Sequence, residues 1–465
     1  PRVQKQQRRR PPRMLFLAST FSSAALQLPA RSSVASHSRV AVSMIAPVEA
    51  ETETKKAVEG PTFSKPLATP DPIPEEGQKR ALELMKSGAL FRYTPGVESE
   101  TALAEWDMTE RTGFKYAVGF NSCGSALFIA LKTCGVQPGD HVLANGFSFT
   151  AVPSAIHHAG AIPVYVECTD AYVMDMEDLE RKINDSAAAG TKIKFLMLTH
   201  MRGKVAEMQR VYEIAKEHDI TVIEDCAHAL GVKWDGVQLG RSASVACYSS
   251  QSAKVINSGE GGFFMTDDDE LAARAACYAG CYEQLYLQHV VAPPAAVFDR
   301  VKFETPNYSL RMSDLAAACV RPQIRSLDAR IAQYNRRYAI ICEALEGCAS
   351  IDIPAINPRV TPVSDSLQFN LQDMSPAQVD AFLAACKRRG MPVGLFGSKE
   401  NARNYENWQY SPAAGPLPNT KRLIAAAIDV RLPAEFDDSD FPKMAAVILA
   451  AVDEFDDSDF PKMAA

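Results

Sequence analysis

Between about residues 115 and 270, segments with the hydrophobic pattern of a β-strand alternate with segments that have the pattern of an amphipathic helix. The apolar run KFLMLTH (194–200) predicts a buried strand, EMQRVYEIAKEHD (207–219) has the spacing of an amphipathic helix, and ITVIED (220–225) predicts a second strand. A strand, a helix and a strand in this order form a βαβ unit. Because such units recur over the region, we expect an α/β fold with a mostly parallel central sheet and helices on both faces.

The pattern changes beyond residue 310, where a long helical pattern (312–345) leads into a second, smaller α/β region. We therefore expect a large domain over residues 76–325 and a small carboxyl-terminal domain over 326–450. The sequence EFDDSDFPKMAA occurs at 435–446 and again, identically, at 454–465. A structural repeat array needs several units, so we interpret the tail at 451–465 as a duplicated segment without a function of its own.

The amino-terminal region differs from the rest in composition. Residues 1–48 carry eight Lys or Arg and no acidic residue, and Met14 opens a short apolar stretch that is followed by Ser, Ala and Arg. This is typical of a targeting leader, which we place at residues 1–50 and expect to be disordered. A plastid is the expected destination, with the mitochondrion and the cytoplasm as alternatives. The proline-rich residues 51–75 predict a linker.

Composition and charge limit the classes of function. A chain of 465 residues with 47% hydrophobic residues can bury the cores of about two or three domains. The net charge is −7, and beyond residue 48 it is −15, from 41 Lys and Arg against 56 Asp and Glu. An acidic body argues against nucleic acid as the main partner. No apolar run approaches the roughly 18 residues of a membrane span, so no membrane partner is expected. The eleven scattered cysteines include no CxxC pair, which predicts reduced thiols and no metal site.

A loop of small residues follows a predicted strand that ends near Phe120. In FNSCGSALFIAL a helix begins near Ser125, and the backbone N–H groups of Cys123, Gly124 and Ser125 suit a phosphate group. Ser and Gly also cap many ordinary helices, so the motif is weak by itself.

Two further motifs supply an acid and an amine. In VIEDCAHA, Asp225 ends an apolar strand; a buried carboxylate there needs a partner such as a protonated pyridine nitrogen, although a helix cap would also satisfy it. In CYSSQSAKVINSGEGG, Lys254 lies among small residues, where partial burial lowers the pKa of its amine and favours Schiff-base formation. Ser249 offers a hydroxyl to the phosphate, and the glycines at 259, 261 and 262 allow a close turn. Together these motifs predict a phosphate-bearing cofactor with a reactive carbonyl.

The same motifs, in the same order, occur in a known family. The stretch from about residue 75 to 330 resembles the DegT/StrS type of sugar aminotransferases, which are fold-type I pyridoxal-phosphate enzymes. The match runs through SGALFRYTPGVESETALAEW, KYAVGFNSCGSALFIALKTCGVQPGDHVL, GAIPVYVECTD, VIEDCAHALG and SAKVINSGEGGFFMTDDDELA. The resemblance implies an aspartate-aminotransferase-like fold, pyridoxal 5′-phosphate as the cofactor, and a homodimer with shared active sites.

The resemblance also implies roles for residues around the cofactor ring. Lys254 matches the Schiff-base lysine, which also moves the proton during transfer, and Asp225 matches the partner of the pyridine nitrogen. Phe149 matches the aromatic residue that stacks on the ring, while Ser252 leaves the other face open. His228 matches the position near the phenolic oxygen of the ring.

Three more positions concern the partner subunit and the substrate. In NYSLRMSDLAAA, Ser309 stands where the family usually has the Asn of a cross-subunit phosphate contact, and Arg311 matches a residue expected to bind substrate. In THMRGKVAEM, Arg202 stands where many family members have an aromatic residue. Two interpretations of Arg202 remain open, namely binding of a carboxylate or phosphate of the substrate and a surface ion pair.

The resemblance therefore predicts an aminotransferase that moves an amino group from glutamate or glutamine to a keto sugar, a sugar nucleotide or a related cyclic ketone. The expected mechanism is a ping-pong reaction through Schiff bases. One alternative is other pyridoxal-phosphate chemistry such as dehydration, although relatives of that kind commonly replace the lysine by histidine. A second is an inactive, cofactor-binding paralogue with a regulatory role. No GxGxxG follows a strand and no GxxxxGK[ST] occurs, which disfavours dinucleotide enzymes and nucleotide phosphotransferases.

Overall fold

The computed structural model describes residues 59–411 and 415–456. The predicted leader and residues 457–465 of the tail lie outside the described residues. Within the predicted linker, Phe63 is buried in the core of the small sheet, and its N–H donates to the carbonyl of Arg389 at 2.8 Å. No helix in the described ranges has both the length and the apolar character needed to cross a bilayer.

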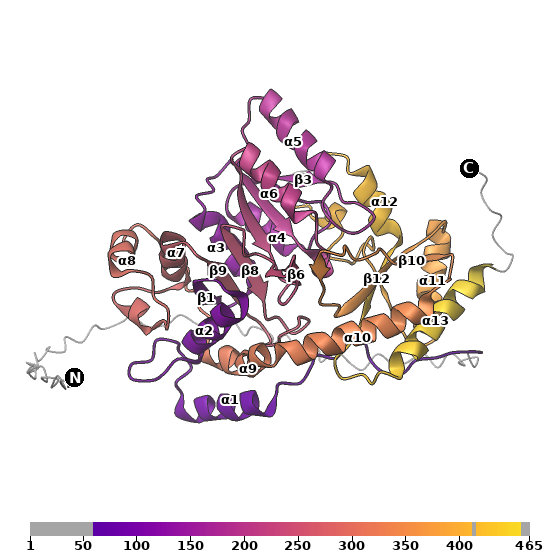
Figure 1. The fold of residues 1–465 in the computed structure, drawn as a ribbon, viewed down its shortest axis with the longest axis horizontal. Helices are drawn as coiled ribbons and strands as arrows, with labels where there is room; N and C mark the ends of the chain where they lie inside the picture. Colours follow the sequence, from indigo (N-terminus) through magenta and orange to yellow (C-terminus); the bar gives the residue numbers. More distant parts are fainter. Residues whose placement is uncertain (1–58, 412–414, 457–465) are drawn as a thin grey trace, which may run out of the picture. The chain divides into compact units, whose positions relative to one another are not determined.

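A seven-stranded sheet forms the centre of the large domain, in the order β1-β9-β8-β5-β4-β2-β3 (Figure 1). Only β9 runs antiparallel to its neighbours, so the predicted mostly parallel sheet is confirmed. Its strands are β1 (Tyr116–Phe120), β2 (His141–Asn145), β3 (Ile162–Val166), β4 (Phe195–Thr199), β5 (Thr221–Asp225), β8 (Val245–Ser249) and β9 (Gly262–Thr266).

Helices cover both faces of this sheet, as the sequence predicts. The strand side chains alternate between two apolar cores: Leu143 and Leu196 pack in one, and Val142 and Met197 in the other. The helices of the large domain are α1 (Glu75–Ser87), α2 (Glu100–Thr112), α3 (Cys123–Thr133), α4 (Ala151–His158), α5 (Met176–Ala188), α6 (Met208–Glu217), α7 (Asp269–Ala279), α8 (Ala295–Val301) and α9 (Asp314–Arg325), with 3-10 turns η1 (Met201–Gly203) and η2 (Leu285–Gln288). Helices α2, α5, α6 and α9 contribute to the first core, and α3, α4, α7 and α8 to the second.

The carboxyl-terminal part contains a separate antiparallel sheet in the order β10-β12-β14-β13. Its strands are β10 (Ile351–Asp352), β12 (Ser366–Leu371), β13 (Gly394–Leu395) and β14 (Ala427–Arg431), and its helices are α10 (Leu327–Leu345), α11 (Pro376–Arg388), α12 (Pro418–Ala426) and α13 (Asp440–Asp456), with the turn η3 (Tyr405–Asn407). Figure 1 shows α9 and α10 following one another from the large sheet toward the small one. A short sheet of β11 (Val360–Thr361), β6 (Lys233–Trp234) and β7 (Val237–Gln238) joins the two parts.

Candidate active site

The carboxyl ends of the central strands gather the predicted polar residues at one edge of the large sheet. Thr199 at the end of β4 pairs in register with Asp225 at the end of β5, and Asp225 pairs with Cys247 of β8. Ser249 ends β8 two residues later. This edge is where open α/β sheets bind ligands.

The first turn of α3 lies at the same edge and has the features of a phosphate cradle. Ser122 caps the helix, accepting from the N–H of Ser125 at 3.0 Å, and the Ser125 hydroxyl donates to Asn121 Oδ1 at 2.7 Å. The N–H groups of Cys123 and Gly124 belong to the first turn, which has no carbonyl four residues back to bind them. They are therefore available to an anion at the positive end of the helix.

Glycine at 262 allows β9 to begin directly against this turn. Gly262 pairs with Phe120 on one side and with Ser249 on the other, so it joins the ends of β1 and β8. A Cβ at this position would lie 2.5 Å from the backbone nitrogen of Cys123 and 2.7 Å from the carbonyl carbon of Ser122. The glycine-rich sequence after Lys254 is thus needed to bring Ser249 and the first turn of α3 together.

Asp225 is a buried carboxylate with few protein groups that stabilise its negative charge. It is 4% exposed, and its Oδ1 accepts one hydrogen bond from the N–H of Ala227 at 3.1 Å. Burial raises its pKa, although the Ala227 bond and the charge of Lys254 act in the opposite direction. A cation at the second oxygen would supply what the carboxylate lacks, as a protonated pyridine nitrogen does.

Lys254 points its amine at His228, with Nζ 2.7 Å from Nε2. Burial, together with the positive charges of Arg202 and Arg403, lowers the pKa of Lys254 to about 7. Burial and the neighbouring Lys254 hold the pKa of His228 well below its usual value, so the imidazole is neutral and accepts from the amine. Its Nδ1 then carries the hydrogen, and this buried atom has no protein partner. The site thus contains a nucleophilic amine, that of Lys254, beside an imidazole N–H, that of His228 Nδ1, which has no acceptor in the protein.

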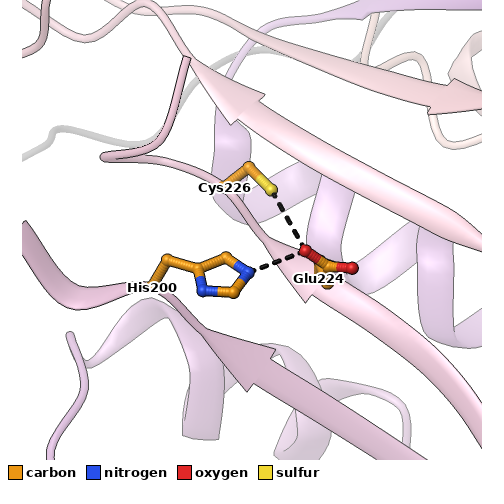
Figure 2. Close-up of side chains that lie close together, drawn as sticks. All are labelled: His200, Glu224 and Cys226. Atoms are coloured by element: carbon orange, nitrogen blue, oxygen red, sulfur yellow. Dashed lines mark hydrogen bonds and ion pairs between the residues drawn. The ribbon is translucent and has the colours of Figure 1, made fainter. Parts of the chain in front are cut away.

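A buried hydrogen-bonded cluster lies next to Asp225 (Figure 2). His200 Nε2 is 2.7 Å from Glu224 Oε2, and Cys226 Sγ lies 4.0 Å from the same oxygen. Glu224 also accepts a hydrogen bond from the Tyr212 hydroxyl. These three potential ligand residues could surround an ion, but burial raises the pKa of Cys226 well above its usual value, which keeps it a thiol. We interpret the cluster as support for the ends of β4 and β5.

Phe149 and Ser252 lie at the same edge of the sheet. Phe149 lies one residue before Thr150, the N-cap of α4. Its side chain is 39% exposed, which is unusual for a phenylalanine in a well-packed region and leaves its ring available for stacking. The Ser252 hydroxyl donates to the carbonyl of Gly259 at 3.3 Å, which holds the loop that carries Lys254.

Arg202 lies at the site but is already engaged by a carboxylate. It adopts a left-handed backbone (φ 53°, ψ 28°) in η1, is 8% exposed, and donates to Asp429 of β14. Its Nε has no partner, and the side chain borders a cavity of about 350 Å³ that Lys204 and Gln368 also line. The ion pair is buried rather than at the surface, and substrate binding by Arg202 stays a prediction.

Ser309 and Arg311 lie on the segment before α9. Ser309 is exposed and has a left-handed backbone (φ 56°), a conformation that Asn adopts more readily than Ser. Its hydroxyl donates to Asn307 Oδ1 at 3.3 Å. The Arg311 guanidinium donates to the carbonyl of Gly280 at 2.9 Å and stacks over Phe91. These contacts do not join either residue to Lys254 of the same chain, and the predicted cross-subunit roles stay predictions.

Two functional candidates were not singled out from the sequence. Arg403 and Arg431, both from the carboxyl-terminal part, contribute positive charge that lowers the pKa of His228. Arg431 donates to the carbonyl of Ala253, next to Lys254, at 2.7 Å. Arg403 belongs to the segment GLFGSKENARNYENW (394–408), but no local pattern in this segment indicates where the side chain points.

The residues present fit pyridoxal 5′-phosphate. Asp225 lacks a cation, His228 Nδ1 lacks an acceptor, and the first turn of α3 offers N–H groups beside Ser249. The ring nitrogen, phenolic oxygen and phosphate of the cofactor are the complements of these three groups. Lys254 supplies the amine that its aldehyde requires.

Comparison with known proteins agrees with this geometry. The model of the DegT/DnrJ/EryC1/StrS aminotransferase family matches residues 72–448. The chain belongs to this family. The DegT/DnrJ/EryC1/StrS resemblance predicted from the motifs is therefore confirmed, and the match extends through the carboxyl-terminal domain.

Among relatives in this family, the chain is 28% identical over 274 residues to the spore coat polysaccharide biosynthesis protein SpsC of Bacillus subtilis strain 168, covering 57% of the chain and 64% of that protein. It is 28% identical over 254 residues to a putative L-glutamine:3-amino-2,3-dideoxy-scyllo-inosose aminotransferase of Micromonospora echinospora, covering 54% and 57%. The matched stretches are thus about three-fifths of these relatives' lengths. The crystal structure of 3-amino-5-hydroxybenzoic acid synthase has a TM-score of 0.71 at 20% identity, covering 84% of the chain and 100% of that chain. This confirms the predicted fold.

Proposed function

We propose that the protein is a pyridoxal-phosphate-dependent aminotransferase that moves an amino group from glutamate or glutamine to a keto sugar, a sugar nucleotide or a related cyclic ketone. The observation that carries this proposal is the amine of Lys254, whose pKa of about 7 leaves it largely uncharged just above neutral pH. It lies near a carboxylate, Asp225, with a single hydrogen bond and beside an imidazole, His228, whose Nδ1 has no partner. One relative is a putative aminotransferase that uses L-glutamine as the donor and an inosose as the acceptor, and this supports the choice of donor and acceptor.

Different residues of the chain have different roles around the cofactor. When bound, pyridoxal phosphate supplies an electron-accepting ring that stabilises negative charge at the substrate carbon. Asp225 would hold the proton on the ring nitrogen, and His228 Nδ1 would donate to the phenolic oxygen. The first turn of α3 and Ser249 would bind the phosphate. The free amine of Lys254 would act as the base that moves the proton during transfer.

The proposed active form is a homodimer, because family members build the site at a twofold interface. Large apolar side chains on the segment from η2 to α9 support this state. Leu287 is 63% exposed, Val290 50% and Phe303 88%. An apolar surface of this kind is typical of a protein–protein interface.

We further propose that residues 1–50 direct the protein to a plastid. The basic, acid-free composition of residues 1–48 supports an organellar leader. Fluorescence microscopy of a fusion that carries residues 1–60 ahead of a reporter tests this, and a reporter that stays in the cytoplasm argues against it.

Reduction with borohydride tests the enzymatic proposal. The purified protein with pyridoxal phosphate should show a visible absorption band that glutamate removes and a ketone acceptor restores. Borohydride should fix a pyridoxyl group on Lys254, identified by mass spectrometry, and K254A should abolish both signals while K192A, a change at an exposed ion pair with Asp219, should not. An adduct at another lysine, or none, contradicts the proposal.

A further inference from the structure

Arg403 is a guanidinium at the candidate site that forms no direct ion pair with a carboxylate of the described residues, although the charge of Asp429 acts on it from farther away. Among the described residues, no Asp or Glu lies within ion-pair distance of Arg403, whereas Arg202 is paired with Asp429. Its buried Nε has no hydrogen-bond partner. Burial and the charge of Arg202 lower its pKa to about 10, which still leaves it charged at neutral pH. An unpaired charge in such a place is costly unless a ligand neutralises it.

The side chain lies over the ring predicted to stack on the cofactor. The Arg403 guanidinium carbon is 5.4 Å from the centre of the Phe149 ring and 6.0 Å from that of Phe396. Arg403 is also among the charges that lower the pKa of Lys254. Arg403 therefore lies beside Phe149 and close enough to Lys254 for its charge to act on the reacting amine.

Three asparagines hold the loop that presents Arg403. The side-chain amide of Asn401 donates to the carbonyl of Leu395 at 2.9 Å, and that of Asn404 donates to the carbonyl of Gly397 at 2.9 Å. Asn407 donates to the Asn401 carbonyl at 3.0 Å. These bonds close the loop on itself, so the backbone that carries Arg403 is held in place before any ligand binds.

A backbone contact docks this loop on the large domain. The N–H of Thr150, the residue after Phe149, donates to the carbonyl of Ala402 at 3.1 Å, and the Thr150 hydroxyl is 2.7 Å from that of Tyr410. The contact places the residue after Ala402 beside Phe149. The loop is thus built to carry a guanidinium into the site.

Two positive charges and one negative charge act on Arg403. Arg202 and Arg431 lower its pKa and Asp429 raises it, but the oxygens of Asp429 already accept from Arg202 and from the Gln368 amide at 3.0 Å. Arg431 is directed to the carbonyl of Ala253. A neutral acceptor would leave Arg403 without an anion when it fills the site and excludes water.

We propose that Arg403 binds an anionic group of the ketone acceptor, a carboxylate or a phosphate ester, so that the acceptor is an acidic ketone and not a neutral keto sugar. This inference rests on the proposed aminotransferase function. A guanidinium binds either anion through two parallel hydrogen bonds, which fixes the orientation of the ketone as well as its charge.

The test compares acceptors in single turnovers of the holoenzyme after charging with glutamate. The acceptors are a neutral inosose, the same inosose as a phosphate ester, and a six-membered cyclic keto acid. The wild type should favour at least one anionic acceptor by about 10- to 100-fold in kcat/KM. R403Q should lose this preference and R403K should keep part of it. R422Q, which changes an exposed ion pair with Asp170, should match the wild type.

The possible results distinguish a failure of the Arg403 inference from a failure of the proposed aminotransferase function. Equal kcat/KM for neutral and anionic acceptors in the wild type overturns the inference, as does an R403Q defect confined to the glutamate half-reaction. Failure of both glutamate and glutamine to remove the visible band overturns the proposed function instead. Calorimetric binding of glutarate and of inorganic phosphate then tests Arg403 directly: weaker binding by R403Q of about 10-fold or more supports it, and unchanged binding overturns it.

Discussion

At the scale of single residues, the protonation of Lys254 decides whether the site can react. An exposed lysine amine is almost fully charged at neutral pH and lacks a lone pair for attack on an aldehyde. In this protein, burial and two guanidinium groups lower the pKa of Lys254 to about 7. The free amine is therefore half populated near pH 7 and dominant above it.

We expect the rate at which the apoenzyme recombines with pyridoxal phosphate to rise with pH through a midpoint near 7. Removing a nearby positive charge stabilises the protonated amine, so R403Q should move this midpoint upward. Stopped-flow absorbance of the visible band, recorded over a range of pH, measures the midpoint for the wild type and for R403Q. R422Q serves as the control for the loss of an arginine, and a wild-type midpoint above pH 9 would contradict the assignment of Lys254.

The sequence predicts some of these residues and not others for a physical reason. Asp225 ends one strand and Lys254 follows another strand of the same mostly parallel sheet, so the periodic pattern and the βαβ order place them at a common edge. The pairing of Arg202 with Asp429 and the approach of Arg403 to Phe149 join segments far apart in the chain. They depend on how the carboxyl-terminal part docks, which no local pattern determines.

At the scale of elements, the junction between β9 and α3 determines the shape of the phosphate cradle. Gly262 lies between the ends of β1 and β8 and in close contact with the first turn of α3. Any side chain there displaces the strand, the helix or both. The cradle depends on their relative position, because its N–H groups must point at one phosphate.

We therefore expect G262A to weaken pyridoxal-phosphate binding by about 10-fold or more and to destabilise the fold by about 1–3 kcal/mol, since the added Cβ meets backbone atoms that cannot rotate away. Equilibrium dialysis and thermal unfolding measure the two effects. G415A is the matched control, because a Cβ there meets no atom within 4 Å and the backbone is not left-handed. Cofactor affinity equal to that of the wild type would show that the junction tolerates a larger separation.

A second junction ties helix α2 to the segment before it and to η2. Glu105 on α2 accepts from the Arg92 guanidinium at 2.9 Å and from the N–H of Gly119 at 2.8 Å, and it lies 2.9 Å from His289 Nδ1. All four groups are buried or belong to buried strands. Burial alone would raise the pKa of Glu105, but the charge of Arg92 and the contact with His289 lower it to about 2.

We expect E105Q to lower the free energy of unfolding by about 3–5 kcal/mol, because it leaves the buried charge of Arg92 without a counter-charge. Since the folded-state pKa of Glu105 lies below its unfolded value, this stability is present above about pH 4.5 and is lost as the pH falls toward 2. Urea unfolding at pH 7 and at pH 3 measures both effects. The difference in free energy of unfolding between the wild type and E105Q should be smaller at pH 3 than at pH 7. A difference that does not change with pH would show that E105Q acts through packing and not through charge.

Long periodic elements are predicted well, and short ones are not. The expected strand, helix and strand at 194–225 appear as β4, α6 and β5, with boundaries shifted by one or two residues. The single helical pattern at 312–345 divides at Ser326 into α9 and α10. Strands β6, β7 and β11 have two residues each, which is too few for an alternating pattern. Tertiary pairing, and not local sequence, creates them.

At the scale of the whole molecule, one surface of the described chain is unusually apolar. The segment from residue 282 to 308 exposes Tyr282, Leu287, Val290, Phe303 and Tyr308. It directly precedes Ser309 and Arg311, the residues with predicted cross-subunit roles. A second subunit covering this surface would bury the apolar side chains and bring the predicted cross-subunit residues toward its site.

We expect the wild type to be a dimer at micromolar concentration and F303D to be largely monomeric, because a carboxylate buried against an apolar partner surface lacks a counter-charge. Sedimentation velocity measures the change, and the aminotransferase rate should fall in parallel as the protein is diluted. V237D is the matched control: Val237 is also exposed, at 53%, but lies in the β6–β7 hairpin, outside residues 282–308. If V237D dissociates the dimer and F303D does not, the interface lies elsewhere, and the cross-subunit roles of Ser309 and Arg311 lose their support.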